Sequence, residues 1–143
     1  MNHHINFVLQ GIDSLGIDQS HANWLLKVAN SFNYNITELN YTFMSDDDLL
    51  ELNKEYLQHD FYTDIITFDN TIGKTISADI AISVDRVIEN SKSLEVTFEE
   101  ELKRVMVHGL LHCIGFKDSS QEEKEQMRLV ESDMLKMFHV EHI

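Results

Sequence analysis

Two histidines, His108 and His112, are the residues whose type and spacing most clearly suggest chemistry. They lie in residues 105–116, where nearly every other side chain is apolar or absent. Four residues of α-helix correspond to a rotation of about 400°, so both imidazoles lie on one face, one turn apart. That arrangement suits two ligands of one metal ion. Because the segment is apolar nearly all round, we expect its helix to be buried.

A carboxylate follows the same segment and can supply a third ligand. Gly115 can end the helix in a left-handed conformation, which places Asp118 three residues beyond the helix end. Two imidazoles and a carboxylate leave a fourth position for water, as a catalytic zinc site requires. We therefore predict one Zn²⁺ per chain, bound by His108, His112 and Asp118.

Two other interpretations of the histidine pair stay open. With eight histidines in the chain, this spacing arises readily by chance, and the pair could be hydrogen-bonded core residues. Metal binding is favoured because a buried imidazole without a partner costs about 1–3 kcal/mol. The peptidase motif His-Glu-x-x-His has the same spacing, but Gly109 stands where that motif has its general base. A zinc peptidase of that type would lack its proton acceptor.

The spacing of apolar residues predicts a mixture of strands and helices. Alternating and β-branched runs predict four strands, at residues 5–9, 36–43, 64–68 and 76–83, the last two forming a hairpin. Apolar residues three and four apart, together with capping residues, predict helices at residues 19–33, 45–57, 84–92, 98–114 and 121–137. We therefore predict an α+β fold, with a single domain over residues 1–143. Its small, mostly four-stranded sheet packs with about five helices, and the metal-binding helix is buried against the sheet.

The composition is that of a globular protein, with 43% hydrophobic and 25% charged residues. The net charge of −14 argues against general binding to nucleic acid or anionic membranes, so an RNA partner requires a local exception. Half of that charge lies in residues 45–69, whereas residues 70–118 hold six of the eleven Lys and Arg. No apolar run is long enough to span a membrane, the one cysteine cannot form an internal disulfide, and we expect no secretory leader. These features predict a cytoplasmic protein with no membrane partner.

Three segments of the chain resemble the YbeY family, in the family's order. The family's metal motif is matched by His108-Gly109-x-Leu111-His112-x-x-Gly115-Phe116-x-Asp118. Residues 52–68 are similar to its Leu-Asn…Tyr…Asp…Thr-Asp motif, and residues 78–83 are similar to its Gly-Asp-Ile-x-Ile strand. The resemblance spans residues 50–137.

This resemblance implies a metal-dependent endoribonuclease, usually with zinc, that acts on single-stranded RNA. It implies a role in maturing the 3′ end of small-subunit (16S) rRNA and in ribosome quality control, with the small ribosomal subunit or its proteins as partners. The alternatives are another zinc metallohydrolase, such as a peptidase, and a non-catalytic ribosome-associated module with a structural metal. We predict neither a catalytic residue beyond the ligands nor an oligomeric state.

The chain departs from the family pattern at two positions that matter for chemistry. The third ligand is commonly His in the family, and Asp118 would make the site more anionic and open to a harder ion such as Mn²⁺. The family also has an Arg that is suspected of catalysis or RNA binding, and Leu57 occupies its position. We hypothesise that Lys117 or His59 supplies the missing positive charge near the metal.

Other charged residues have two interpretations each. Four basic residues could line a groove beside the metal: Arg86, Lys92, Lys103 and Arg104. For the last two we favour ion pairs with Glu99 and Glu100 on their own helix. Asp64 could accept a hydrogen bond from a metal-bound imidazole, or it could pair elsewhere.

Overall fold

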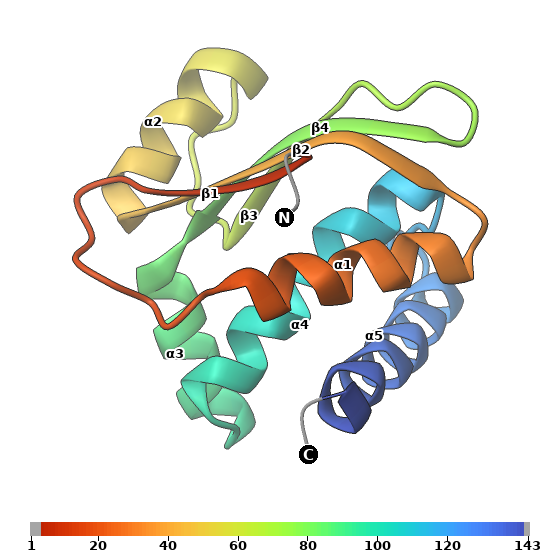
Figure 1. Ribbon diagram of the computed structural model, residues 1–143. Coiled ribbons are helices and arrows are strands. Elements are labelled where there is room, and N and C mark those ends of the chain that lie inside the picture. Colours follow the sequence, from red (N-terminus) through yellow and green to blue (C-terminus); the bar gives the residue numbers. More distant parts are fainter. Residues whose placement is uncertain (1–3, 142–143) are drawn as a thin grey trace.

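Figure 1 shows the computed structural model, which describes residues 4–141. The strands are β1 (Ile5–Leu9), β2 (Asn35–Met44), β3 (Ile65–Asp69) and β4 (Thr75–Ser83). They form one mixed sheet in the order β1-β2-β4-β3. β2 pairs in parallel with both β1 and β4, whereas β3 and β4 are antiparallel. The four predicted strands are confirmed, and the β3–β4 pair is the predicted hairpin.

Helices cover both faces of this sheet. They are α1 (Gln19–Ser31), α2 (Asp46–Leu57), α3 (Val84–Leu94), α4 (Phe98–Ile114) and α5 (Gln121–Glu141). In Figure 1, α1 and α4 lie beneath the sheet and α2 lies on the opposite side. α5 packs against α1 and α4 rather than against the strands. The predicted α+β class, with its five helices and four strands, is confirmed for the part of the chain that the structure describes.

The central strand β2 shows why the sheet has one strongly buried face. Leu39, Tyr41 and Phe43 alternate along it and are fully buried. Asn40 and Thr42 point to the other face and are partly exposed. The Tyr41 hydroxyl donates to the backbone carbonyl of Met106 at 2.8 Å. This buried face therefore holds α4 by a directed hydrogen bond as well as by apolar packing.

Helix α4 has a capping residue at each end. The Thr97 side chain accepts from the backbone N–H of Glu100, and Gly115 ends the helix with φ of 115°. In between, α4 lies close to the sheet at Gly109. A Cβ there would stand 2.9 Å from Ile80 Cδ1 and 3.0 Å from Ile65 Cδ1. Helix α4, which carries His108 and His112, is thus buried against the sheet, as predicted, and a glycine permits the close approach.

Helix α5 presents an apolar stripe to α1 and α4 that contains one acidic residue. Met127 and Phe138 are buried in it, and the Phe138 ring meets the edge of Trp24 at a centroid distance of 5.3 Å. The Trp24 indole also donates to the Met134 carbonyl at 2.8 Å. Glu131, on the same stripe, is only 1% exposed. A buried carboxylate requires a hydrogen-bond or charge partner.

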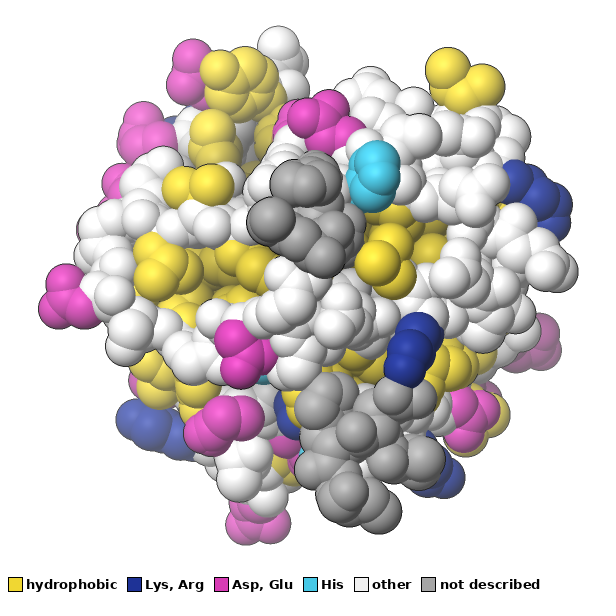
Figure 2. Space-filling view, in the orientation of Figure 1, with side chains coloured by type: hydrophobic (Ala, Val, Ile, Leu, Met, Phe, Trp, Pro, Cys, Tyr) yellow, Lys and Arg dark blue, Asp and Glu magenta, His cyan; other side chains and the backbone are white. Residues whose placement is uncertain are grey.

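The surface reflects the acidic composition. In Figure 2, which keeps the orientation of Figure 1, acidic side chains are scattered over the visible face rather than gathered into one patch. Within residues 4–141, no helix combines the length and the apolar character needed to cross a membrane.

Candidate metal centre

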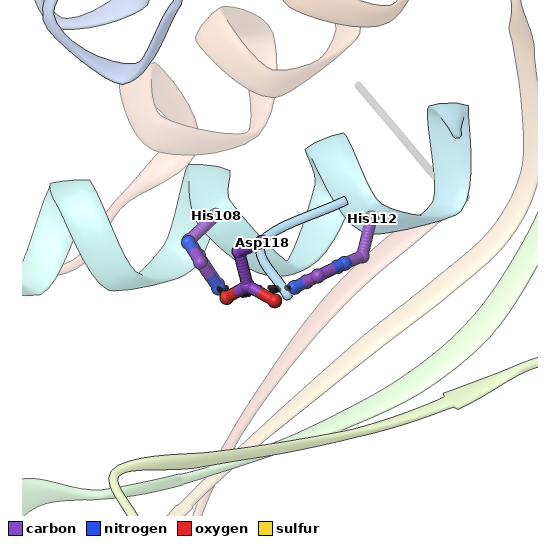
Figure 3. Close-up of side chains that lie close together, drawn as sticks. All are labelled: His108, His112 and Asp118. Carbon is purple, nitrogen blue, oxygen red and sulfur yellow. Dashed lines mark hydrogen bonds and ion pairs between the residues drawn. The ribbon is translucent and has the colours of Figure 1, made fainter. Parts of the chain in front are cut away.

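The structure brings together the three predicted ligands. His108 Nε2 lies 3.1 Å from His112 Nε2 and 3.3 Å from Asp118 Oδ2. His112 Nε2 lies 3.6 Å from the same Asp118 oxygen. In Figure 3 the two imidazoles extend from α4 on one side of the helix, and Asp118 reaches between them from the following turn. Three donor atoms from three side chains therefore converge on one point.

These separations fit a tetrahedral metal ion. Zinc bonds to nitrogen and oxygen of about 2.0–2.1 Å place two ligand atoms about 3.3 Å apart. The observed distances of 3.1, 3.3 and 3.6 Å bracket that value. Two imidazole nitrogens and a carboxylate oxygen are also donors that zinc accepts. Within the described residues, no fourth His, Cys, Asp or Glu joins this group. A four-coordinate ion held by these three atoms would therefore have one position left for water or substrate.

The chain after α4 folds so that Asp118 returns to the histidines. The Gly115 N–H donates to the carbonyls of Leu111 and His112, which closes the helix end. The Phe116 ring then packs edge-on against the ring of Phe32, with 5.4 Å between the ring centres. This contact anchors the turn on α1 and fixes the direction from which Asp118 approaches.

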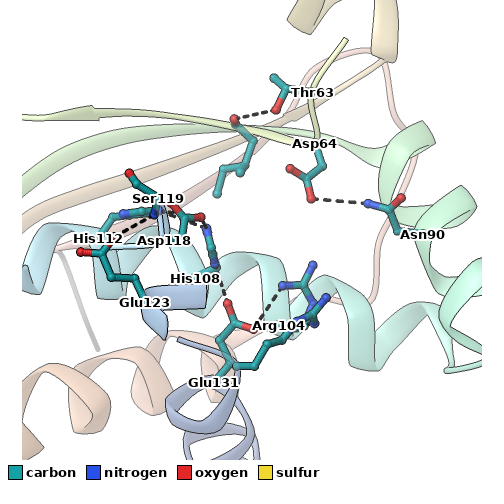
Figure 4. A network of polar contacts seen from close by, with 12 residues as sticks. Thr63, Asp64, Asn90, Arg104, His108, His112, Asp118, Ser119, Glu123 and Glu131 are labelled. Carbon is teal, nitrogen blue, oxygen red and sulfur yellow. Dashed lines mark hydrogen bonds and ion pairs between the residues drawn. The ribbon is translucent and has the colours of Figure 1, made fainter. Parts of the chain in front are cut away.

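The second ring nitrogen of His108 has a partner that sequence reasoning missed. His108 Nδ1 lies 2.5 Å from Glu131 Oε2 on α5 (Figure 4). Donation from Nδ1 to this carboxylate keeps the lone pair of Nε2 directed at the other two ligands. Of the two roles considered for Asp64, the structure shows pairing elsewhere: it receives a hydrogen bond from Asn90 at 3.4 Å. The available signal was the acidic residue within the apolar stripe of α5.

Glu131 is itself held by an arginine on α4. Arg104 Nη1 lies 3.2 Å from Glu131 Oε1, and its Nε and Nη2 donate to Glu101 at 2.8 and 2.6 Å. Burial disfavours the charge of Arg104, but its hydrogen bond to Glu101 and its attraction to both carboxylates outweigh burial and raise its pKa. This network fixes Glu131 in the position that orients His108.

The predicted pairing of Arg104 with Glu99 or Glu100 is therefore wrong. Arg104 instead pairs with Glu101, which lies three residues before it on α4 and is 1% exposed. Lys103 is also buried, and its ammonium lies 4.2 Å from the centre of the Phe138 ring. Lys103 is thus part of the packing between α4 and α5.

Two pockets flank the ligand group. One, of about 280 Å³, lies between α4 and α5 and includes Arg104, His108, Asp118, Lys124, Arg128 and Glu131 in its lining. The other, of about 510 Å³, lies toward β3 and includes Thr63, Thr67, Asp69, His108, His112 and Asp118. Asp64 lines both. A substrate can therefore reach the ligand group from either side.

The residues expected to replace the family's arginine lie outside both linings. Lys117 is exposed, and the His59 ring stacks on Phe61 at 5.0 Å. Arg86 pairs with Asp46 at 3.2 Å and so is occupied elsewhere. Of the four basic residues considered as the lining of a groove, Arg104 is the one that lines a pocket beside the ligands.

The position of a peptidase general base is also blocked. In the peptidase motif that base follows the first histidine, which corresponds to Gly109. A Cβ at Gly109 would already crowd Ile65 and Ile80 of the sheet, so a glutamate there would require these side chains to move. This packing argues against a peptidase of that type in addition to the absence of the base itself.

Comparison with known proteins identifies the family. The family model described as Endoribonuclease YbeY matches residues 10–139. The chain belongs to this family. It is 47% identical over 137 residues to an Endoribonuclease YbeY of Christiangramia forsetii, covering 96% of each chain. It is 49% identical over 137 residues to that of Flavobacterium johnsoniae, covering 96% of this chain and 99% of the relative. The recognised resemblance is confirmed, and it extends beyond residues 50–137.

A solved structure agrees with the YbeY fold. A solution structure of a protein from Thermotoga maritima aligns with a TM-score of 0.67 and 24% identity, covering 96% of this chain and 93% of the other. At that identity the likeness concerns the fold alone. It supports the arrangement of sheet and helices described above.

Proposed function

We propose that this chain is a zinc-dependent endoribonuclease that cleaves single-stranded RNA. The observation that carries the proposal is the convergence of His108, His112 and Asp118 beside two pockets, with no fourth protein ligand among the described residues. A structural metal in a non-catalytic module would instead be enclosed by four protein ligands. Relatives named Endoribonuclease YbeY, 47% and 49% identical, support RNA as the substrate.

The chain's own residues have separate tasks in this proposal. His108 and His112 present their Nε2 lone pairs, and Glu131 holds the Nδ1 proton of His108 so that its ring cannot turn. Asp118 supplies the third ligand atom and a negative charge. When bound, the ion supplies Lewis-acid chemistry, polarising a phosphodiester oxygen and acidifying water. The half-exposed position of Asp118, with 40% of its side chain accessible, keeps the group open to a large substrate.

The proposed setting is the maturation of the 3′ end of 16S rRNA and the quality control of ribosomes in the cytoplasm. Family membership supports this setting. The small ribosomal subunit or its proteins would then be partners. Such partners could bring RNA to a chain whose net charge of −14 disfavours binding RNA from solution.

The test compares labelled single-stranded RNA incubated with the wild type, His108→Ala and His139→Ala. His139 is exposed on α5 and lines neither pocket, so it controls for loss of a histidine. We expect cleavage by the wild type and His139→Ala, none by His108→Ala, and none after metal is removed with EDTA. Circular dichroism of each variant checks that it is folded.

Three other outcomes would contradict the proposal. Equal cleavage by the wild type and His108→Ala would indicate a contaminating nuclease. Casein cleavage that requires His108 would favour a peptidase. Stoichiometric metal without RNA cleavage, also in the presence of ribosomal subunits, would favour the non-catalytic module.

A further inference from the structure

The two pockets beside the ligand group differ in charge. The pocket between α4 and α5 is lined by three basic side chains, Arg104, Lys124 and Arg128, and by three carboxylates, Asp64, Asp118 and Glu131. The pocket toward β3 is lined by three carboxylates, Asp64, Asp69 and Asp118, with no Lys or Arg in its described lining. A bound divalent ion would make the first lining formally +2 and the second −1. A polyanion is therefore attracted to one side of the ion and repelled from the other.

Two of the three cations are available to a ligand. Arg104 is committed to the buried carboxylates of Glu101 and Glu131. Lys124 and Arg128 are four residues apart on α5, so they lie on one face of the helix. Lys124 is exposed, and Arg128 has 55% of its side chain exposed. The ion pair that Arg128 makes with Glu131 is long, at 3.9 Å. With its guanidinium in solvent and at this distance, Arg128 is held weakly and can exchange this contact for a phosphate.

We propose that Lys124 and Arg128 bind phosphates next to the scissile bond, so that the RNA backbone runs along α5 rather than over β3. This inference rests on the proposed function. It would also compensate for the absence of the family's arginine at Leu57, because Lys124 and Arg128 on α5 supply positive charge in its place. The chain's local exception to its overall acidity is thus the pocket between α4 and α5.

The test is the double variant Lys124→Ala/Arg128→Ala, with Lys136→Glu as its matched control. Both change the net charge by two units, and Lys136 is an exposed residue of α5 outside both pockets. Steady-state cleavage of a fluorescent single-stranded RNA oligonucleotide is measured between about 50 and 200 mM salt, a range over which phosphate contacts weaken strongly. Zinc per chain is measured for each protein.

We expect the double variant to raise KM about tenfold, with kcat within about twofold of the wild type. The slope of log affinity against log salt should fall by about 1.4, since each single-strand phosphate contact contributes about 0.7. Zinc content should not change. Lys136→Glu should change KM by less than about twofold, because its charge acts only through the general field.

Two results would overturn the inference while leaving the proposed function intact. The first is a KM and salt slope in the double variant equal to those of Lys136→Glu. The second is a loss of zinc from the double variant, because the residues would then act on the metal site rather than on RNA.

If the wild type does not cleave RNA, the proposed function fails and binding decides the inference separately. Fluorescence anisotropy of the same oligonucleotide is then measured with the zinc-loaded proteins. Weaker binding by the double variant than by Lys136→Glu supports the α5 path. Equal binding by both, or no binding by the wild type, overturns it.

Discussion

His108 has two ring nitrogens, and each has a separate partner. Nε2 faces His112 and Asp118, while Nδ1 meets Glu131, a residue 23 positions later in the chain. The ligand motif is local, lying within residues 108–118, but the orientation of its first member depends on α5. The candidate ligands therefore come from one short segment that is recognisable in the sequence, whereas the group that orients His108 comes from a distant helix.

Replacing Glu131 tests this division. We expect Glu131→Ala to weaken zinc binding by about 10- to 100-fold, because the ring of His108 loses the acceptor that orients it. Glu131→Gln, which can still accept a hydrogen bond, should recover part of the affinity. Competition with a chromophoric chelator measures the affinity. Asp133→Ala is the control, since it removes an exposed carboxylate from the same helix outside both pockets. Unchanged affinity in Glu131→Ala would contradict the role assigned to Glu131.

Burial makes the thiol of Cys113, next to the candidate ligand His112, a poor nucleophile. Burial, followed by the nearby charge of Asp69, raises the pKa of its thiol to about 12. An ordinary thiol ionises near 8.5, so the thiolate fraction at pH 8 is roughly a thousandfold smaller here. We expect alkylation by iodoacetamide at least that much slower in the native protein than in urea. The native rate should rise about tenfold per pH unit between about pH 8 and 10. Fast native labelling at pH 8 would contradict this.

At the scale of elements, the position of α4 is set by contacts on two sides. Toward the sheet, Gly109 allows close approach to β3 and β4. Toward α5, the pairing of Arg104 with Glu101 and Glu131 joins the two helices. Gly109 is adjacent to His108, and Arg104 is one helical turn before it. Changes at either should therefore affect stability and the metal centre together.

Gly109→Ala tests the contact with the sheet. Alanine favours the helix by about 1 kcal/mol, but its Cβ would press on Ile80, which is 1% exposed, and overpacking costs about 1–3 kcal/mol. We expect a net loss of about 1 kcal/mol in the free energy of unfolding by urea. Adding Ile80→Val removes the closest methyl group and should recover most of it. A Gly109→Ala protein more stable than the wild type would refute the packing argument.

Arg104→Met tests the contact between the helices. The substitution keeps a flexible apolar side chain but removes the guanidinium that pairs with two carboxylates, each 1% exposed. Removing one partner of a buried ion pair costs about 3–5 kcal/mol. We expect a loss of that size in urea unfolding, and a smaller loss when Glu101→Gln is added to remove one of the stranded charges. A variant as stable as the wild type would show that the network does not hold α4 and α5 together.

Particular residues show how much of this structure was predictable. Alternation in β2 and the caps of α4 are local signals, so the elements and the fold class followed from them. The parallel pairing of β1 with β2 depends on contacts such as Ile5 with Leu39, which no local pattern encodes. The proximity of the three ligands was foreseeable because they lie within eleven consecutive residues, 108–118. The partner of His108 and the basic residues of the pocket lie on α5, and their proximity could not be predicted before the position of that helix was known.

At the scale of the whole molecule, metal binding and folding should be coupled. The three candidate ligand atoms converge only when α4 and the turn after it are folded, so an ion bound there would stabilise the native state. Free Zn²⁺ at about 100 times its dissociation constant should raise the free energy of unfolding by about 2.7 kcal/mol. Thermal unfolding with and without EDTA measures this, and His108→Ala should show little difference. An EDTA-insensitive wild type would contradict the coupling.

That residues 1–143 form one domain stays a prediction.

The shared pocket of ligands and basic residues has a thermodynamic consequence. If a bound ion increases the affinity for RNA by some factor, reciprocity requires RNA to increase the affinity for the ion by the same factor. Protein bound to RNA would then keep its zinc at free metal concentrations at which RNA-free protein loses it. When zinc is scarce, the RNA-bound molecules would be the last to lose activity.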